Sequence, residues 1–195
     1  MIGSLLKTLG LGGVDDGPVG TETVGVIAET IEGLEPDRAR FVAAFAYLLS
    51  RVAFADHEVT ATERETMEQQ LAEYGGIPGD QASEAVREAL HATGRHGATE
   101  DYQVAREFSA LATDEEKLRL LRCLFALSAH HGISTTEDNE ISRIANGLRL
   151  ETRQVTDVRA EYRDRLNVLR PRAGGGKDGD ASPAKAAAPL DAGSQ

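Results

Sequence analysis

A nine-residue pattern occurs twice in the sequence, and this internal repeat constrains the fold more than any other feature. The copies span residues 55–63 and 129–137, an offset of 74, and they share Ala, His, Thr and Glu at four matched positions. Two further positions pair Val with Ile and Thr with Ser. Because each copy lies between two segments of helical apolar spacing, the sequence predicts two related helix hairpins that pack about a pseudo-twofold axis.

The apolar residues outside the repeat also recur at helical spacing, and no segment alternates strongly enough to compete as a strand. We therefore expect an all-α fold of about seven helices. Their expected spans are residues 37–52, 61–74, 80 or 83 to 93, 100–111, 114–128, 135–148 and 155–169. Thr99, Thr113 and Ser134 are the expected N-caps of the fourth, fifth and sixth of these helices. Residues 21–34 are expected to form a short helix in preference to a loose extended segment.

Composition divides the chain of 195 residues into three parts. Residues 1–20 are expected to be a flexible arm and linker, and residues 21–170 one helical domain whose core lies within 36–170. Residues 171–195 are rich in Gly, Ala and Pro, which predicts disorder. The core of the domain must be mainly aliphatic, because the chain has no Trp and only five Phe.

The charge of the chain favours some partners over others. The formal net charge is −11, and none of the three parts carries a net positive charge. A protein that binds nucleic acid needs a basic surface for the phosphates, so we expect no nucleic-acid partner. Cations and basic protein surfaces are the more natural partners for such a chain.

Residues 1–13 and Cys123 bear on the location of the protein. The apolar cluster within residues 1–13 is too short and interrupted for a signal peptide or a membrane span. It suits a weakly amphipathic arm that docks on the domain or on a membrane edge. Cys123 is the only cysteine, so it cannot form an intrachain disulfide, and it is compatible with a reducing interior. We expect a cytoplasmic protein in which Cys123 is a packed or half-buried helix residue.

Each copy of the repeat contains a helix-capping pattern. Thr60-x-x-Glu63 and Ser134-x-x-Glu137 have the spacing of a capping box, in which the hydroxyl and the carboxylate accept hydrogen bonds from backbone N–H groups at the start of a helix. Val59 and Ile133 precede the two caps and would fix the angle of the following helix. Capping alone is therefore a sufficient reason for both glutamates.

A second polar position precedes each capping box, at Asp56 and His130. An acid near the C-terminus of a helix is unfavourable unless a cation compensates it, whereas a His is favoured there. If the two hairpins face each other, Asp56, Glu63, His130 and Glu137 converge as three carboxylates and one imidazole. Such a set suits a divalent cation such as zinc, manganese, iron, calcium or magnesium, and the imidazole favours a transition metal. From these residues alone, pure capping and metal ligation both remain open.

These residues resemble the TerB-like family, which comprises tellurite-resistance TerB proteins and the N-terminal domain of the DjlA co-chaperone. The family has two helix hairpins that each read approximately Ala-Asp-Gly, followed by a Glu at the spacing that separates Asp56 from Glu63. The resemblance covers about residues 36–150. It implies an all-helical fold and a metal site made by Asp56, Glu63, His130 and Glu137. This chain departs from the family pattern at His57, where Gly is expected, and at His130-His131, where Asp-Gly is expected.

The resemblance implies a metal-binding, stress-associated helical module of the tellurite-resistance type rather than an enzyme. The sequence contains no phosphate-binding loop, no Gly-x-Ser-x-Gly and no Cys-x-x-Cys, and nothing in it supplies a separate nucleophile. The alternative is a metal-free helical adaptor, or a co-chaperone-type interaction domain, in which Glu63 and Glu137 are caps only. Either version predicts a protein partner.

Overall fold

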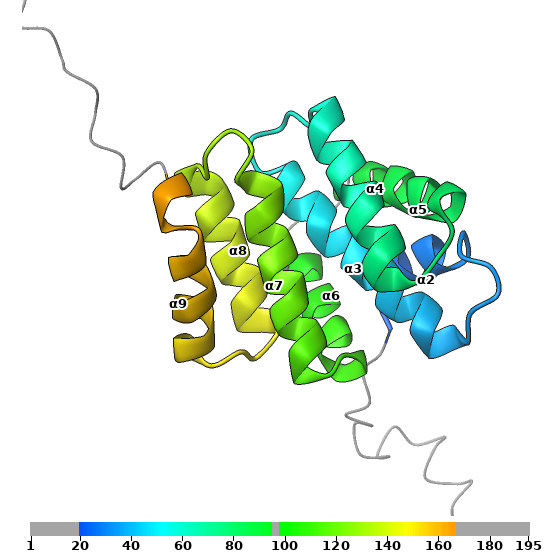
Figure 1. Ribbon diagram of the computed structural model, residues 1–195. Coiled ribbons are helices and arrows are strands. Elements are labelled where there is room, and N and C mark those ends of the chain that lie inside the picture. The colour runs from blue at the N-terminus through cyan, green and yellow to red at the C-terminus, as the bar shows by residue number, and fades with distance from the viewer. Residues whose placement is uncertain (1–19, 95–97, 167–195) are drawn as a thin grey trace, which may run out of the picture.

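The computed structural model describes residues 20–94 and 98–166, and the regular structure in these ranges is helical (Figure 1). The helices are α2 (Glu22–Ala28), α3 (Pro36–Ala53), α4 (Ala61–Gly75), α5 (Gly79–Thr93), α6 (Ala98–Leu111), α7 (Asp114–Ser128), α8 (Thr135–Gly147), α9 (Thr152–Glu161) and the 3-10 helix η2 (Arg163–Arg165). The all-α prediction is confirmed. The predictions for residues 1–19 and 167–195 lie outside the described residues. No helix within the described ranges is long and apolar enough to cross a membrane.

Local capping signals determine where several of these helices begin. Thr60, Thr113 and Ser134 each accept a hydrogen bond from the backbone N–H of the Glu three residues later, and that Glu accepts one from the N–H of the cap. These bonds satisfy N–H groups that a helix leaves unpaired in its first turn. Gly76 ends α4 in the left-handed conformation, with φ of +69°.

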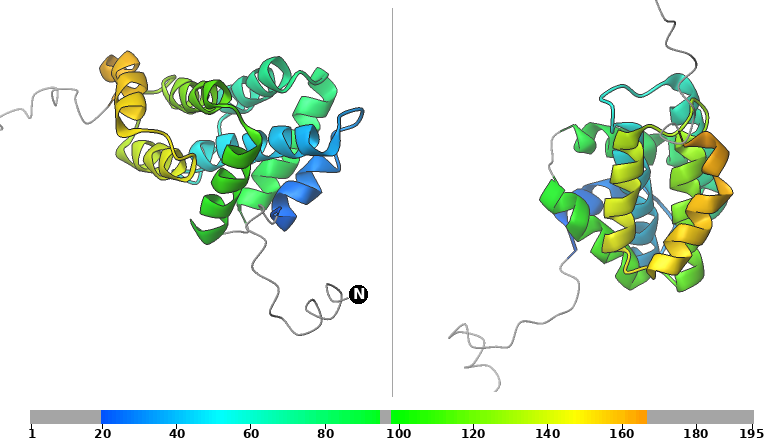
Figure 2. Two further views of the ribbon diagram at one scale, coloured as in Figure 1. Left: turned by 90° about the horizontal axis from the view of Figure 1, so that it is seen from below. Right: turned by 90° about the vertical axis from the view of Figure 1, so that its left-hand side faces the viewer.

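Helix α3 runs through the centre of the molecule. It contacts α2, α4, α5, α6, α7 and α8, and every residue from 41 to 50 is buried. The sequence of this stretch, FVAAFAYLLS, is apolar around nearly the whole circumference of the helix, as expected of a helix enclosed by others. Figure 2 shows α3 (light blue) with α2 and α5 towards one side of the molecule and α8 and α9 towards the other.

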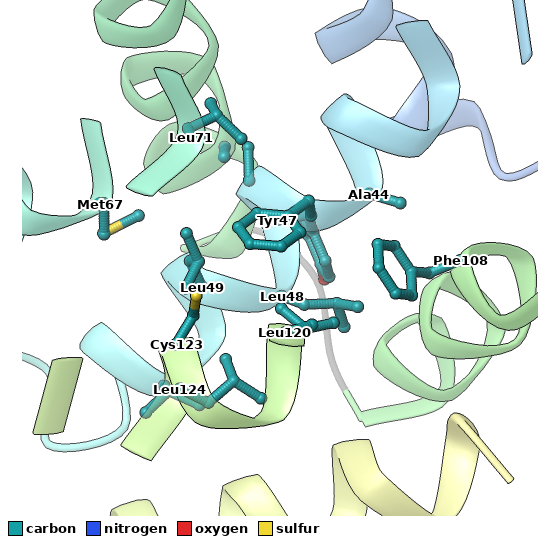
Figure 3. Close-up of a cluster of buried hydrophobic side chains, with 14 of the residues drawn as sticks. Ala44, Tyr47, Leu48, Leu49, Met67, Leu71, Phe108, Leu120, Cys123 and Leu124 are labelled. Atoms are coloured by element: carbon teal, nitrogen blue, oxygen red, sulfur yellow. The ribbon is translucent and has the colours of Figure 1, made fainter. Parts of the chain in front are cut away.

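The core around α3 is mainly aliphatic. Figure 3 shows side chains from four helices meeting there, among them Leu48 of α3, Met67 of α4, Phe108 of α6 and Leu124 of α7, all of them buried. The rings of Phe41 and Phe108 stack with their centroids 4.9 Å apart. Removing these apolar surfaces from water is the main favourable contribution to the stability of such a domain.

The structure corrects the predicted end of one helix, α2, and the predicted start of another, α6. Helix α2 ends at Ala28 instead of continuing towards Leu34, since the chain turns there and Gly33 adopts a φ of +77°. Helix α6 begins at Ala98, so the prediction that Thr99 is its N-cap is wrong. A Thr signals a nearby helix start without determining its position to the residue.

The end of the domain also differs from the prediction. Helix α9 stops at Glu161 and the chain continues as η2, whereas the apolar spacing predicted one helix up to Leu169, a residue outside the described ranges. The change of helix type lets Leu166 turn inward, where it is 3% exposed and forms an isolated parallel bridge with Ile133. The last described residues are therefore attached to the turn between α7 and α8.

Helix α8 approaches α6 closely at Gly147. A Cβ added at Gly147 would lie 2.5 Å from the Cβ of Ala105. Both atoms would be attached directly to a helix backbone, so neither could swing aside. Gly147→Ala is expected to separate the two helices and to lower the free energy of unfolding by about 1–3 kcal/mol in chemical denaturation. Gly79→Ala is the control, because an added Cβ there would meet no atom within 4 Å; an equal loss in both variants would contradict this explanation.

Candidate functional site

The two hairpin turns lie at the same end of the molecule (Figure 1). One turn joins α3 to α4, and the other joins α7 to α8. Thr66 on α4 and His130 in the second turn bring them together, with 3.4 Å between Thr66 Oγ1 and His130 Nε2. The second turn is held further by Ile133, whose N–H donates to the carbonyl of Arg165 at 2.8 Å. The two copies of the repeat therefore contribute to one end of the domain.

Glu63 and Glu137 are helix caps in the structure. Oε2 of Glu63 accepts hydrogen bonds from the N–H and the hydroxyl of Thr60, both at 2.8 Å, and Oε2 of Glu137 accepts one from the N–H of Ser134, also at 2.8 Å. The two glutamates are 8% and 9% exposed. Oε1 of each takes no part in the cap. Since a carboxylate can accept at both oxygens, capping does not preclude metal ligation.

Asp56 and His130 are exposed and lie in the turns, beyond the helix ends at which they were expected. Helix α3 ends at Ala53, three residues before Asp56, whereas α7 continues to Ser128, two residues before His130. Asp56 Oδ1 accepts a hydrogen bond from the N–H of Glu58 at 3.3 Å. A short-range bond of this kind is typical of Asp in a turn.

The two turns differ in which position of the repeat takes the left-handed backbone conformation. The left-handed residue is His57 in the first turn, with φ of +67°, and Gly132 in the second, with φ of +86°, which is one position later in the repeat. Gly adopts this conformation readily, whereas His does so less often. The Phe54 ring meets the His57 ring edge-on, with 5.4 Å between centroids, and this contact helps to hold the first turn. Asp56 and His130 consequently occupy non-equivalent backbone positions.

The predicted ligands are distributed over the two turns without forming a compact set. In the part of the chain that the structure describes, no group of three or more His, Cys, Asp or Glu side chains is arranged to hold a metal ion. A cation shared by both turns would therefore require Asp56 and His130 to move towards Glu63 and Glu137. Both side chains are exposed, which leaves room for that movement. The joint metal site stays a prediction.

A buried ion-pair network, which the sequence reasoning missed, joins α3, α6 and α8. Arg51 Nε lies 2.9 Å from Asp101 Oδ1, and Arg51 Nη2 lies 3.6 Å from Glu140 Oε1. The Tyr47 hydroxyl donates to Asp101 Oδ1 at 2.9 Å. Arg143 Nη1 lies 3.0 Å from Glu140 Oε2. Each helix therefore contributes at least one charged side chain to a shared polar interior.

Burial raises the pKa of both carboxyl groups in this network, Asp101 and Glu140, and the guanidinium of Arg51 opposes the rise in both. Burial, together with the Asp101 charge, also raises the pKa of Tyr47.

One signal in the sequence could have pointed to this network. Asp101 stands on the apolar stripe of its helix, one turn before the buried Val104, and a charged residue on an apolar stripe needs a buried partner.

A groove of about 540 Å³ lies between α4 and α7 and extends to Tyr162. Cys123 lines this groove and is 4% exposed, which confirms that it is a packed helix residue. Burial raises the pKa of its thiol to about 12, so the thiol is protonated near neutral pH and is a poor nucleophile. Gln70, Arg119 and other polar side chains form much of the remaining lining. The groove therefore offers no activated cysteine.

The comparisons with known proteins give one match. The family model described as tellurite resistance protein TerB matches residues 42–160. The matched range contains both hairpin turns and all of the predicted ligands, as well as the ion-pair network. No curated protein and no solved structure matches the chain.

Proposed function

Because the chain belongs to the TerB family, we propose that it is a non-catalytic, stress-associated helical module that binds a divalent cation where its two hairpin turns meet. The residues that would hold the cation are Asp56, Glu63, His130 and Glu137. Their carboxylates and imidazole supply ligands suited to zinc, manganese, iron, calcium or magnesium. The bound cation would fasten the two hairpins together and stabilise the surface that a protein partner recognises.

The contact between α4 and the second hairpin turn carries this proposal. Thr66 Oγ1 on α4 and His130 Nε2 in the second turn lie 3.4 Å apart, so the two hairpins meet at one end of the domain. Glu63 and Glu137 each retain one carboxylate oxygen that the cap does not use. Asp56 and His130 are exposed, and on binding a cation they would move towards Glu63 and Glu137, with His130 leaving Thr66. The formal net charge of −11 further favours a cation over an anion.

A metal-free adaptor is the second candidate, and one observation favours it. Glu116 completes a third capping box at the start of α7, where its Oε2 accepts from the N–H of Thr113 at 2.9 Å. This capping box belongs to neither copy of the repeat. The other oxygen of Glu116, Oε1, pairs with Arg38 at 3.0 Å. The chain thus uses the same pattern where no metal is proposed, and Glu63 and Glu137 would be caps only in the adaptor version.

Replacing Glu63 and Glu137 together by Gln distinguishes the two candidates. Gln completes a capping box as Glu does, so the double variant keeps its caps and loses two charged ligands. Titration calorimetry of the full chain with zinc, manganese, calcium and magnesium should show binding of at least one cation to the wild type. For that cation, the double variant should bind at least about tenfold more weakly, because two carboxylate ligands are lost.

Glu116→Gln is the control outside the repeat: it changes a capping Glu in the same way and also weakens the partly exposed pair of Glu116 with Arg38. Its cation affinity should equal that of the wild type. Undiminished binding by the Glu63→Gln, Glu137→Gln variant would show that these glutamates are not ligands and would contradict the proposal. A wild type that binds none of the four cations, and no iron(II) in the same titration, would contradict the proposal and favour the metal-free adaptor.

A further inference from the structure

A cleft of about 230 Å³ lies between α6 and α8, beside the buried ion-pair network. It is lined by Asp101 and Tyr102 of α6 and by Glu140, Arg143, Ile144 and Asn146 of α8. Tyr102 is one of the few large apolar side chains exposed in the described ranges, at 55%. The cleft therefore combines an accessible aromatic ring, an aliphatic side chain and two carboxylates.

Two carboxylate oxygens at this cleft are buried without a hydrogen-bond donor. The side chains of Asp101 and Glu140 are only 9% and 6% exposed. Within the described ranges, Asp101 Oδ2 and Glu140 Oε1 have no hydrogen-bond partner. A buried acceptor without a donor is costly, and the cost is greater for a charged group. Both residues line the cleft, so a donor bound there lies beside the two carboxylates and reaches these oxygens once the side chains turn towards it.

The charges around the cleft define the ligand. Arg51 lies between the two carboxylates on the interior side, where it leaves Asp101 Oδ2 without a donor and meets Glu140 Oε1 only in a long ion pair of 3.6 Å. Arg143 lies at the outer side and pairs with Glu140 Oε2, while its side chain remains 60% exposed. With two guanidinium groups this close, two carboxylates are too few ligands for a divalent metal ion. A singly charged donor with several N–H groups fits better.

We propose that this cleft binds a primary alkylammonium group, either the side chain of a lysine on a protein or one end of a small diamine. An ammonium carries three N–H donors on a compact charge, enough to reach both unsatisfied oxygens. Its alkyl chain would lie along Ile144 and the ring of Tyr102, where contact with an aromatic face also favours a cation.

Arg143 is the competitor of such a ligand. It occupies one oxygen of Glu140 through a pair within its own helix, and its exposed side chain can turn into solvent. The incoming ammonium would replace it beside Glu140, which keeps the local charge balanced. Removing the guanidinium should therefore strengthen binding, and Arg143→Gln is the variant that tests this.

Chemical-shift perturbation in NMR spectra of the full chain tests the proposal, with N-acetyl-lysine methylamide as the probe and N-acetyl-norleucine methylamide as its uncharged control. EDTA in the buffer removes any contribution from a divalent cation at the hairpin turns. The lysine probe should shift resonances of α6 and α8 around Asp101 and Glu140, and the norleucine probe should not. Glu140→Gln should weaken binding at least about tenfold, since it removes a charged hydrogen-bond acceptor.

Tyr102→Ala provides a second variant, because replacing a residue this exposed is expected to leave the fold intact. It should also weaken the binding of the lysine probe, whereas Arg143→Gln should strengthen it. Equal shifts with the two probes, or equal affinity in all three variants, would overturn the proposal. The same titration with 1,5-diaminopentane distinguishes the two sources of the ammonium group. If the diamine binds more tightly than the lysine probe, the site is assigned to a free diamine; if it binds more weakly, the site is assigned to a lysine side chain.

Discussion

Replacing Arg51 by Met is expected to lower the free energy of unfolding by about 3–5 kcal/mol, because the buried carboxylates of Asp101 and Glu140 then lose the cation they share. Met fills a similar volume, so the loss reports the charge rather than a cavity. Equilibrium denaturation in urea, monitored by circular dichroism, measures it. Arg143→Met is the matched control. It removes the exposed partner of the same Glu140 and should cost less than about 1 kcal/mol.

The loss caused by Arg51→Met should decrease as the pH falls. Burial already raises the pKa of Asp101 and Glu140 in the folded state, and removing the guanidinium raises it further. The folded variant therefore takes up protons at a pH where the unfolded chain does not, which stabilises it relative to the unfolded chain on acidification. A loss that is equal for Arg51→Met and Arg143→Met, or that grows at lower pH, would contradict this account of the network.

Replacing Phe108 by Ala is expected to cost about 3–5 kcal/mol, because it opens a cavity where α6 packs on α3. Phe108 is fully buried, and its ring stacks on that of Phe41 and lies 6.1 Å from that of Phe45. Tyr102→Ala truncates an exposed aromatic residue of the same helix and should cost far less. The same denaturation experiment compares the two. A similar loss in both variants would show that α6 is not anchored by the Phe108 ring.

The all-α fold and the positions of the caps could be predicted because their signals are local. Thr60, Thr113 and Ser134 precede their glutamates at capping-box spacing, and each begins a helix in the structure. Where a boundary depends on packing, the local signal was insufficient. The end of α9 is the clearest case, since Leu166 leaves the helical stripe to pack beside Ile133, more than thirty residues earlier in the chain.

The candidate site was predicted only in part. The repeat identified both turns and both capping glutamates, and these lie at one end of the domain. The repeat did not reveal that the left-handed residues of the two turns, His57 and Gly132, stand at unmatched positions. The network of Arg51, Asp101 and Glu140 was missed because its members come from three helices and are far apart in the sequence.

The matched positions of the two turn glutamates in the repeat do not by themselves establish a metal site, because capping also accounts for a Glu there. Glu63 and Glu137 stabilise their own helices through Oε2 whether or not a cation is bound. A cation would add a bond between hairpins that capping cannot supply. Metal-dependent stability and stoichiometric metal content are therefore expected only of the proposed metal-binding module. Intact helix starts are expected of both this module and the metal-free adaptor.

Elemental analysis of the full chain tests the central claim most directly. The protein would be purified without chelators, dialysed against equal concentrations of zinc, manganese, calcium and magnesium, and freed of unbound ions before its metal content is measured. The account predicts close to one equivalent of a single divalent cation in the wild type and in Glu116→Gln, and its loss from the Glu63→Gln, Glu137→Gln variant. A wild-type protein that retains no cation, or a double variant that retains as much, would contradict it.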